Sequence, residues 1–246
     1  MSATHRKKIE RLESSDACYT PPGLARACVD RLIVDGWVRN PETIRTLEPS
    51  CGEMAWVKAL LWKGFARERL TANDSNPMPG VAVNPDFEGI DLQSRDFLRA
   101  GFRDFDLVVG NPPYNDTMAH LEVSLEALTP TGVLAYLLPI GWFTAQGGKE
   151  RSRQAWLNGD GKPTHVYLVT PRPKFREGSG TDFAAYAMVV WATGARRGAG
   201  VDIIDWFDAR EMDDEEARPA KEAARLAAKV AKKAKLEALR LGLVAP

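Results

Sequence analysis

The sequence contains few of the residues that build metal centres and disulfide frameworks. It has three cysteines and three histidines among 246 residues. Cys18, Cys28 and Cys51 show neither zinc-type spacing nor a pattern that would pair them. We therefore expect no metal site, and we expect a cytoplasmic protein with reduced thiols.

Long apolar runs and an excess of charge of one sign are also absent. No run approaches the roughly 18 apolar residues that span a bilayer, and residues 1–15 lack the apolar core of a signal peptide. No membrane partner is expected. Lysine plus arginine and aspartate plus glutamate each number 33, so the formal net charge is zero. This balance argues against a protein whose whole surface is basic for nucleic-acid binding, and it is compatible with local basic faces.

What the sequence does have is an alternation of short apolar runs with helical stretches. Apolar residues make up 44% and charged residues 27%, which is a globular composition. Strands are predicted at 43–47, 69–73, 89–91, 106–109, 133–139, 165–170 and 183–191, and helical spacing is found at 53–64 and 118–128. This alternation predicts an α/β fold with a doubly wound, mostly parallel, seven-stranded sheet. The last two strands are joined without a convincing helix, so one antiparallel strand is expected.

The composition changes near residue 210. Residues 1–210 are expected to hold the sheet, and residues 211–246 to form a charged helical extension, because Ala, Lys, Glu and Leu dominate there. Positions 211–216 carry five acids, whereas positions 217–240 carry eight bases and two acids. Such a segment is commonly a solvated helix. The sharper hypothesis is a basic arm along a nucleic-acid backbone, with a homodimer contact through the same helix.

Polar and turn-forming residues follow the predicted strands, at the sheet edge where doubly wound folds bind ligands. The loop 48–54 leads from the first strand to a helix, and its Gly52 permits a close backbone approach. Asp74 ends the second strand, where a carboxylate can accept both hydroxyls of a ribose. Asp96 and Phe97 follow the third strand and can offer a carboxylate to an adenine amino group and a wall to its ring. The alternative for the loop 48–54 is an ordinary strand-to-helix turn, and the alternative for Asp74 is a surface aspartate. The alternative for Asp96 and Phe97 is a helix cap with a core phenylalanine.

The tetrapeptide Asn111-Pro112-Pro113-Tyr114 after the fourth strand is far more specific. Two consecutive prolines keep the backbone extended and remove two N–H donors, so carbonyl groups are left without ladder partners. The Asn111 side-chain oxygen and the Pro112 carbonyl can both accept hydrogen bonds from one planar amino group, and Tyr114 offers a face to a planar ring. This arrangement suits an exocyclic amine held for attack on a carbon electrophile. The alternative is a proline-rich turn.

Taken in order, these residues resemble those of the amino-methylating DNA methyltransferases, which use S-adenosylmethionine. The resemblance covers about residues 16–192, and Asn111–Tyr114 has the form associated with adenine N6. It implies a Rossmann-like class I methyltransferase fold, with catalysis by Asn111, Pro112 and Tyr114 and with Pro113 and Tyr114 against the target base. The cofactor-binding residues that the resemblance implies are Tyr19, Thr20, Pro21, Glu48, Pro49, Ser50, Cys51, Gly52, Asp74, Asp96, Phe97 and Asn111.

Two positions depart from the family's cofactor loop. Met54 stands where the family has its second loop glycine, and Cys51 replaces a residue that is usually small. The Met54 side chain is expected either to crowd the loop or to point into the helix that follows.

Target recognition is expected in the short stretch 141–182, which predicts a relaxed or short sequence specificity. In the family an aromatic residue at the corresponding hairpin packs on the flipped base, and Phe175 is the candidate, with a core anchor as the alternative. Positions 149–177 contain seven bases and three acids, which form either solvated loops or a surface for phosphates. The DNA contacts predicted there are Lys149, Arg151, Arg153, Arg172, Lys174 and Arg176.

The predicted function is transfer of a methyl group from S-adenosylmethionine to the N6 amino group of adenine in DNA, by direct attack from a flipped-out base. The alternatives are an RNA substrate, a glutamine of a protein substrate, and a catalytically silent DNA-binding subunit. The motif 19–21 and the basic aromatic stretch favour DNA. The stretch 171–191 also resembles phage-encoded methyltransferases, so the expected location is the cytoplasm of a bacterial or phage-infected host cell. No nuclease motif is found, and no obligate restriction subunit is expected.

Overall fold

The computed structural model of the protein describes residues 19–144, 148–173, 175, 184–194 and 204–208. These residues belong to one structural unit. The extension predicted for 211–246 lies outside them, and so does the dimer contact predicted with it. Both stay predictions.

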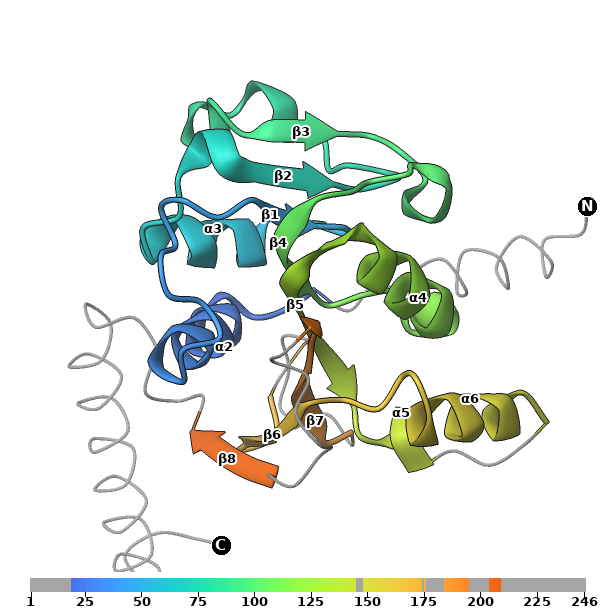
Figure 1. Ribbon diagram of the computed structural model, residues 1–246. Helices are drawn as coiled ribbons and strands as arrows, with labels where there is room; N and C mark the ends of the chain where they lie inside the picture. The colour runs from blue at the N-terminus through green and yellow to red at the C-terminus, as the bar shows by residue number, and fades with distance from the viewer. Residues whose placement is uncertain (1–18, 145–147, 174, 176–183, 195–203, 209–246) are drawn as a thin grey trace, which may run out of the picture. The chain divides into compact units, whose positions relative to one another are not determined.

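The centre of this unit is a sheet of eight strands in the order β3-β2-β1-β4-β5-β7-β6-β8 (Figure 1). β7 runs antiparallel to its neighbours β5 and β6, whereas the other described neighbours pair in parallel. The strands are β1 (Thr46–Glu48), β2 (Leu70–Asn73), β3 (Asp91–Gln93), β4 (Phe105–Gly110), β5 (Leu128–Pro139), β6 (His165–Thr170), β7 (Tyr186–Ala192) and β8 (Ile204–Asp208).

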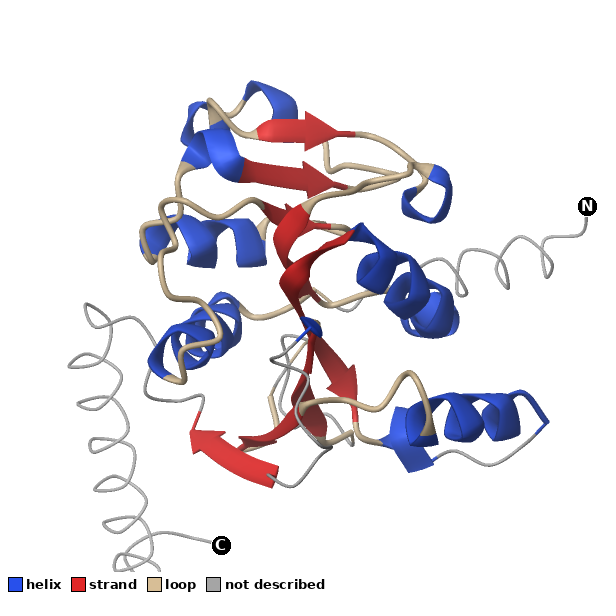
Figure 2. Cartoon of the chain, viewed as in Figure 1, coloured by secondary structure: helices blue, strands red, loops and turns tan. Residues whose placement is uncertain are grey.

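Helices cover both faces of the sheet. Figure 2 shows α2 (Pro22–Val34) and α3 (Ala55–Trp62) on one face and α4 (Thr117–Ala127) on the other. α5 (Gly141–Thr144) and α6 (Gly148–Asn158) follow β5. Short 3-10 turns complete the connections: η1 (Arg67–Arg69), η2 (Val81–Val83), η3 (Pro85–Phe87), η4 (Phe97–Arg99) and η5 (Tyr114–Asp116). This arrangement confirms the predicted doubly wound α/β fold with one antiparallel strand.

The spacing of apolar residues explains the central elements. Leu107, Val108 and Val109 of β4 are all fully buried, as expected of a parallel strand that is covered on both faces. α4 buries residues three or four positions apart, which places them on one helical face toward the sheet. These residues are Thr117, His120, Leu121, Ser124 and Ala127.

The elements that were not expected from the sequence include β8 and α6. β8 extends the sheet beyond β6, which it pairs in parallel from Val166↔Ile204 to Thr170↔Asp208. Its five residues alternate poorly between apolar and polar side chains, and only the edge that β6 offers makes them a strand. α6 forms within the stretch 141–182, where the sequence analysis expected loops.

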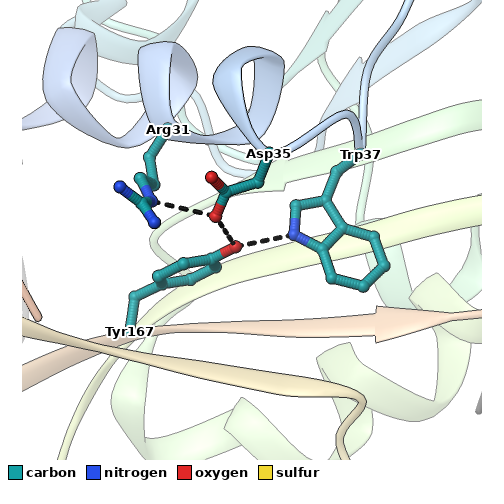
Figure 3. A network of polar contacts seen from close by, with 4 residues as sticks. All are labelled: Arg31, Asp35, Trp37 and Tyr167. Carbon is teal, nitrogen blue, oxygen red and sulfur yellow. Dashed lines mark hydrogen bonds and ion pairs between the residues drawn. The ribbon is translucent and has the colours of Figure 1, made fainter. Parts of the chain in front are cut away.

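The C-terminal end of α2 is tied to β6 by a network of polar contacts (Figure 3). The Arg31 Nε lies 2.9 Å from the Asp35 Oδ2, and the Trp37 Nε1 donates to the Tyr167 hydroxyl at 2.8 Å. The Tyr167 hydroxyl in turn donates to Asp35. Burial raises the pKa of Tyr167 above its usual range, so the phenol keeps the proton that this contact needs. The network fixes the helix that begins, at its other end, beside the predicted cofactor motif.

Replacing Tyr167 by phenylalanine is expected to lower the free energy of unfolding by about 1–3 kcal/mol, because Trp37 and Asp35 both lose a partner while the ring is kept. Urea unfolding checks this value. Substituting Trp37 by phenylalanine in the same background should then cost little more, since the shared hydrogen bond is already gone. Full additivity of the two substitutions would contradict the network.

Candidate functional site

A pocket of about 240 Å³ opens at the carboxyl ends of β1, β2 and β4. It brings together segments that are far apart in the chain: the residues before α2, the loop after β1, the end of β2 and the loop after β4. Ten of the residues predicted for the site line this pocket, namely Tyr19, Thr20, Ser50, Cys51, Gly52, Asp74, Asn111, Pro112, Pro113 and Tyr114. This is the sheet edge at which ligands were expected.

The loop after β1 lines the pocket with Ser50, Cys51, Gly52 and Glu53. Gly52 adopts a left-handed φ of 44°, and a Cβ there would lie 2.9 Å from the Tyr19 ring. The backbone N–H of Cys51 donates to the Asn73 carbonyl at 2.9 Å, which ties the loop to the end of β2. A glycine is therefore required where the chain passes Tyr19.

Met54 takes the left-handed conformation that glycine would adopt more easily, with φ 65° and ψ 20°, and it caps the start of α3. Its side chain is fully buried and does not line this pocket. Of the two expected outcomes, the structure therefore shows a side chain directed into the protein rather than one that crowds the pocket. The cost is backbone strain of about 1–2 kcal/mol.

Asp74 joins the two loops that form the pocket wall. Its Oδ2 accepts a hydrogen bond from the Gly52 N–H at 2.9 Å, and its Oδ1 accepts one from the Asn76 N–H at 2.9 Å. A carboxylate oxygen has two lone pairs, so each oxygen can still accept a further hydrogen bond from a ligand.

Glu48 lies buried beneath the same loop. Its Oε1 accepts a hydrogen bond from the Ser50 N–H at 3.2 Å, whereas its Oε2 has no partner among the described residues. Burial raises the pKa of Glu48 to about 8, and the nearby charge of Asp74 adds to this effect, against the lowering by the Ser50 N–H. A Cβ at Gly110 would lie 2.3 Å from the Glu48 Oε1, so glycine is required before the tetrapeptide 111–114 as long as Glu48 is present.

Neighbouring side chains hold the loops in place. The Thr20 hydroxyl accepts a hydrogen bond from the Trp56 Nε1 at 3.0 Å, which fixes the segment before α2 against α3. The buried Asn73 donates to the carbonyl of Pro49 at 3.0 Å. Trp56 and Asn73 were missed by sequence reasoning, because neither belongs to a motif. Pro21 caps α2 and does not line the pocket.

The loop after β4 is fixed by Thr117, the first residue of α4. The Thr117 hydroxyl donates to the carbonyl of Pro113 at 3.2 Å and to that of Tyr114 at 3.1 Å. Pro112 is buried, and Asn111 and Tyr114 are partly buried at the pocket wall. The tetrapeptide thus runs from the end of β4 to the start of η5, and its four residues line the same pocket as the loop after β1.

Asp96 and Phe97 do not line the pocket. The Asp96 side chain accepts a hydrogen bond from the Leu98 N–H at 3.1 Å and caps η4. Phe97 is buried in the core, where its ring lies 5.3 Å from that of His120. The pair thus forms the helix cap and the core phenylalanine of the alternative, and its contact with an adenine stays a prediction. Burial lowers the pKa of His120.

The residues predicted to contact the target differ in their surroundings. Phe175 lies with its ring 4.5 Å from that of Tyr186, which in turn lies 6.3 Å from that of Tyr114. Arg153 is used within the protein, since its guanidinium lies over the Trp142 ring at 4.8 Å and donates to the Trp142 carbonyl. Arg172 is exposed, whereas the side chains of Lys149, Arg151, Lys174 and Arg176 lie outside the described part of the chain.

No group of three or more His, Cys, Asp or Glu side chains among the described residues is placed to hold a metal ion. No helix in that part of the chain is both long enough and apolar enough to cross a membrane.

The order β3-β2-β1-β4-β5-β7-β6, with β7 antiparallel and the pocket above β1, β2 and β4, is the Rossmann-like class I methyltransferase fold. No protein-family model and no curated protein sequence matches the chain. Its fold is nevertheless shared with solved structures at low sequence identity.

The chain is similar to the methyltransferase subunit of a type I restriction-modification system from Streptococcus thermophilus, with a TM-score of 0.58 and 16% identity over 80% of this chain and 48% of that one. A protein assigned as a class I S-adenosylmethionine-dependent methyltransferase in Listeria monocytogenes matches with a TM-score of 0.56 and 13% sequence identity. The match covers 83% of this chain and 69% of that one. The type IIG restriction endonuclease BpuSI matches with a TM-score of 0.54 and 15% sequence identity, over 77% of this chain. The chain spans 26% of the length of BpuSI.

Proposed function

We propose that the protein binds S-adenosylmethionine in this pocket and transfers its methyl group to the N6 amino group of adenine in DNA. The observation that carries the proposal is the placement of Asn111, Pro112 and Tyr114 in the wall of the same pocket as Gly52 and Asp74. An amino nucleophile held by residues 111–114 would meet there a cofactor that is held by Gly52 and Asp74.

The pocket residues fit this cofactor in two respects. Asp74 retains acceptor capacity for the ribose hydroxyls while it holds Gly52 and Asn76. Glu48, beneath the pocket wall, has one carboxyl oxygen without a partner among the described residues, and an ammonium group of the methionine part would favour its ionised form.

The chemistry that the chain itself supplies is the positioning of an amine. When bound, S-adenosylmethionine supplies a methyl carbon on a sulfonium, which leaves as a neutral thioether when the amino nitrogen attacks. The Asn111 side-chain oxygen and the Pro112 carbonyl each accept a hydrogen bond from the amino group. These hydrogen bonds strengthen as positive charge develops on the nitrogen. The nitrogen then loses one proton to solvent. No strong general base is needed, and His120 is buried away from this wall.

Asp74→Ala is expected to weaken the binding of S-adenosylmethionine by about 10-fold or more, because both the loop anchor and the ribose acceptor are lost. Isothermal titration calorimetry measures the affinity. Asp86→Asn, an exposed aspartate of η3 away from the pocket, is the control and should bind as the wild type does. Unchanged affinity in Asp74→Ala would remove the cofactor assignment of this residue.

DNA is the favoured substrate for two reasons. The segment 19–21, which resembles the upstream motif of DNA methyltransferases, places Tyr19 and Thr20 in the pocket wall. Two of the structural neighbours are also named as parts of restriction enzymes or restriction-modification systems. A base in a duplex would have to be flipped to reach Asn111, and Tyr114 and Phe175 would replace its stacking at about 1–3 kcal/mol per base.

The proposal is tested by incubating the protein with labelled S-adenosylmethionine and random-sequence DNA, total RNA or a protein extract. Label in DNA that maps to N6-methyladenine is the expected result. Mapping would also show whether the sequence preference is as short as the stretch 141–182 predicts. Label in RNA or on glutamine instead would replace DNA as the substrate. Cofactor binding without transfer to any of the three would favour a catalytically silent subunit.

A further inference from the structure

Tyr186 is a buried aromatic residue that the proposed mechanism has not used. It is the first residue of β7 and is 4% exposed. Its register partner is Pro139, at the carboxyl end of β5, and the Ile140 N–H donates to the carbonyl of Ala185 at 2.8 Å. The start of the antiparallel strand is therefore fixed at the sheet edge on which the pocket lies.

The Tyr186 ring lies beside two aromatic rings from different segments. Its centroid is 4.5 Å from that of Phe175, with an interplanar angle of 40°, and 6.3 Å from that of Tyr114, with an angle of 44°. Phe175 belongs to the connection between β6 and β7, whereas Tyr114 belongs to the loop after β4. We call Tyr114, Tyr186 and Phe175 the aromatic triad.

We propose that Tyr186 is a positioning residue for the target base, which sets the placement of the Tyr114 and Phe175 rings on which a flipped base can stack. This inference rests on the proposed function. Stacking contributes about 1–3 kcal/mol per base only when the receiving rings are already ordered. Tyr186 supplies this order because its backbone is fixed in the sheet, while its ring contacts both partners.

A core aromatic with a purely structural role would behave differently. Its loss would lower stability and would affect every ligand of the pocket alike. Loss of a positioning residue affects the substrate whose stacking it prepares and leaves the cofactor untouched, since Tyr186 does not line the pocket around Gly52 and Asp74. The effect should also shrink when the target base is easily flipped, because less of the flipping cost then has to be repaid.

The test compares Tyr186→Leu, Tyr186→Met and Tyr186→Phe with the wild type, on a duplex that contains the mapped site and on the same duplex with a mismatch opposite the target adenine. Tyr167→Leu, at a buried tyrosine of β6 outside the aromatic triad, is the matched control. Circular dichroism shows which variants fold. Tyr186→Met keeps a large side chain at this position and serves as the second variant if Tyr186→Leu does not fold. Calorimetry gives the affinity for S-adenosylmethionine.

The expected result is a fall of at least 10-fold in kcat/KM for the paired duplex in Tyr186→Leu or Tyr186→Met, with cofactor affinity within two-fold of the wild type. The mismatch should recover part of the loss, and Tyr186→Phe and Tyr167→Leu should keep kcat/KM for DNA. Wild-type kcat/KM in both non-aromatic variants, an equal loss of cofactor affinity, or no recovery on the mismatched duplex would overturn the inference. Absence of transfer to DNA by the wild type would instead overturn the proposed function, and the inference with it.

Discussion

Asn111→Ala is expected to abolish methyl transfer to DNA, with a loss of at least about 100-fold in kcat, while the affinity for S-adenosylmethionine stays within a few-fold of the wild type. Asn111 supplies one of two acceptors for the amino group, and these hydrogen bonds strengthen in the transition state. The loop itself should persist, because Thr117 holds the carbonyls of Pro113 and Tyr114 independently of the Asn111 side chain.

A matched control is available in the same turn. Asn115 is exposed and does not line the pocket, so Asn115→Ala is expected to retain transfer. Single-turnover assays with labelled S-adenosylmethionine measure the chemical step, and calorimetry measures cofactor binding. Near-normal methylation by Asn111→Ala would exclude the proposed mechanism, even if the pocket binds the cofactor.

Glu48 is expected to make the protein less stable as the pH rises from 5 to 8. Its pKa is 4.5 in its ordinary state and about 8 in the folded protein, because burial disfavours the charged form. The folded state therefore holds a proton that the unfolded state has lost, and the free energy of unfolding falls with pH across this interval. The difference reaches on the order of 4 kcal/mol at the upper end.

Urea unfolding at pH 5 and pH 8 tests this dependence. Glu48→Gln keeps the shape and the neutral state of the side chain, so this variant should lose most of the pH dependence and exceed the wild type in stability at pH 8. Glu122→Gln, on the exposed side of α4, is the control and should keep the wild-type dependence. Parallel pH profiles in the wild type and Glu48→Gln would rule out a neutral Glu48.

The same residue links cofactor binding to proton release. An ammonium group drawn to Glu48 would favour the carboxylate, so S-adenosylmethionine binding at pH 7 should release up to one proton in the wild type and none in Glu48→Gln. Calorimetry in two buffers of different ionisation enthalpy counts the protons. The variant that is more stable without ligand is therefore expected to bind the cofactor less tightly.

The sequence was informative where chemistry requires particular residues in consecutive order. Asn111–Tyr114 and the loop that contains Gly52 were predicted and were brought into one pocket, because each is a contiguous motif at a strand end. Asp96 and Phe97 have the right types and order, yet the same two residues make an ordinary helix cap and a core contact. Their local pattern is the same in both cases, and only the packing separates them.

Residues that act across the fold could not be predicted in this way. Trp56 and Asn73 hold the pocket through partners on other segments, and Tyr186 lies against the ring of Phe175; their sequence neighbours give no sign of these contacts. β8 was missed for a related reason, since its pairing with β6 depends on an edge that exists only in the folded sheet.

The close approach of Glu48 and Gly110 has a consequence for how this sequence can evolve. A single methyl group at position 110 would overlap the Glu48 carboxyl, and a shorter acid at position 48 would leave room for it. Gly110→Ala should therefore be harmful alone and tolerated together with Glu48→Asp. The two positions are separated by 62 residues along the chain (110 minus 48), and they would have to change in a fixed order, with the shortening of the acid first.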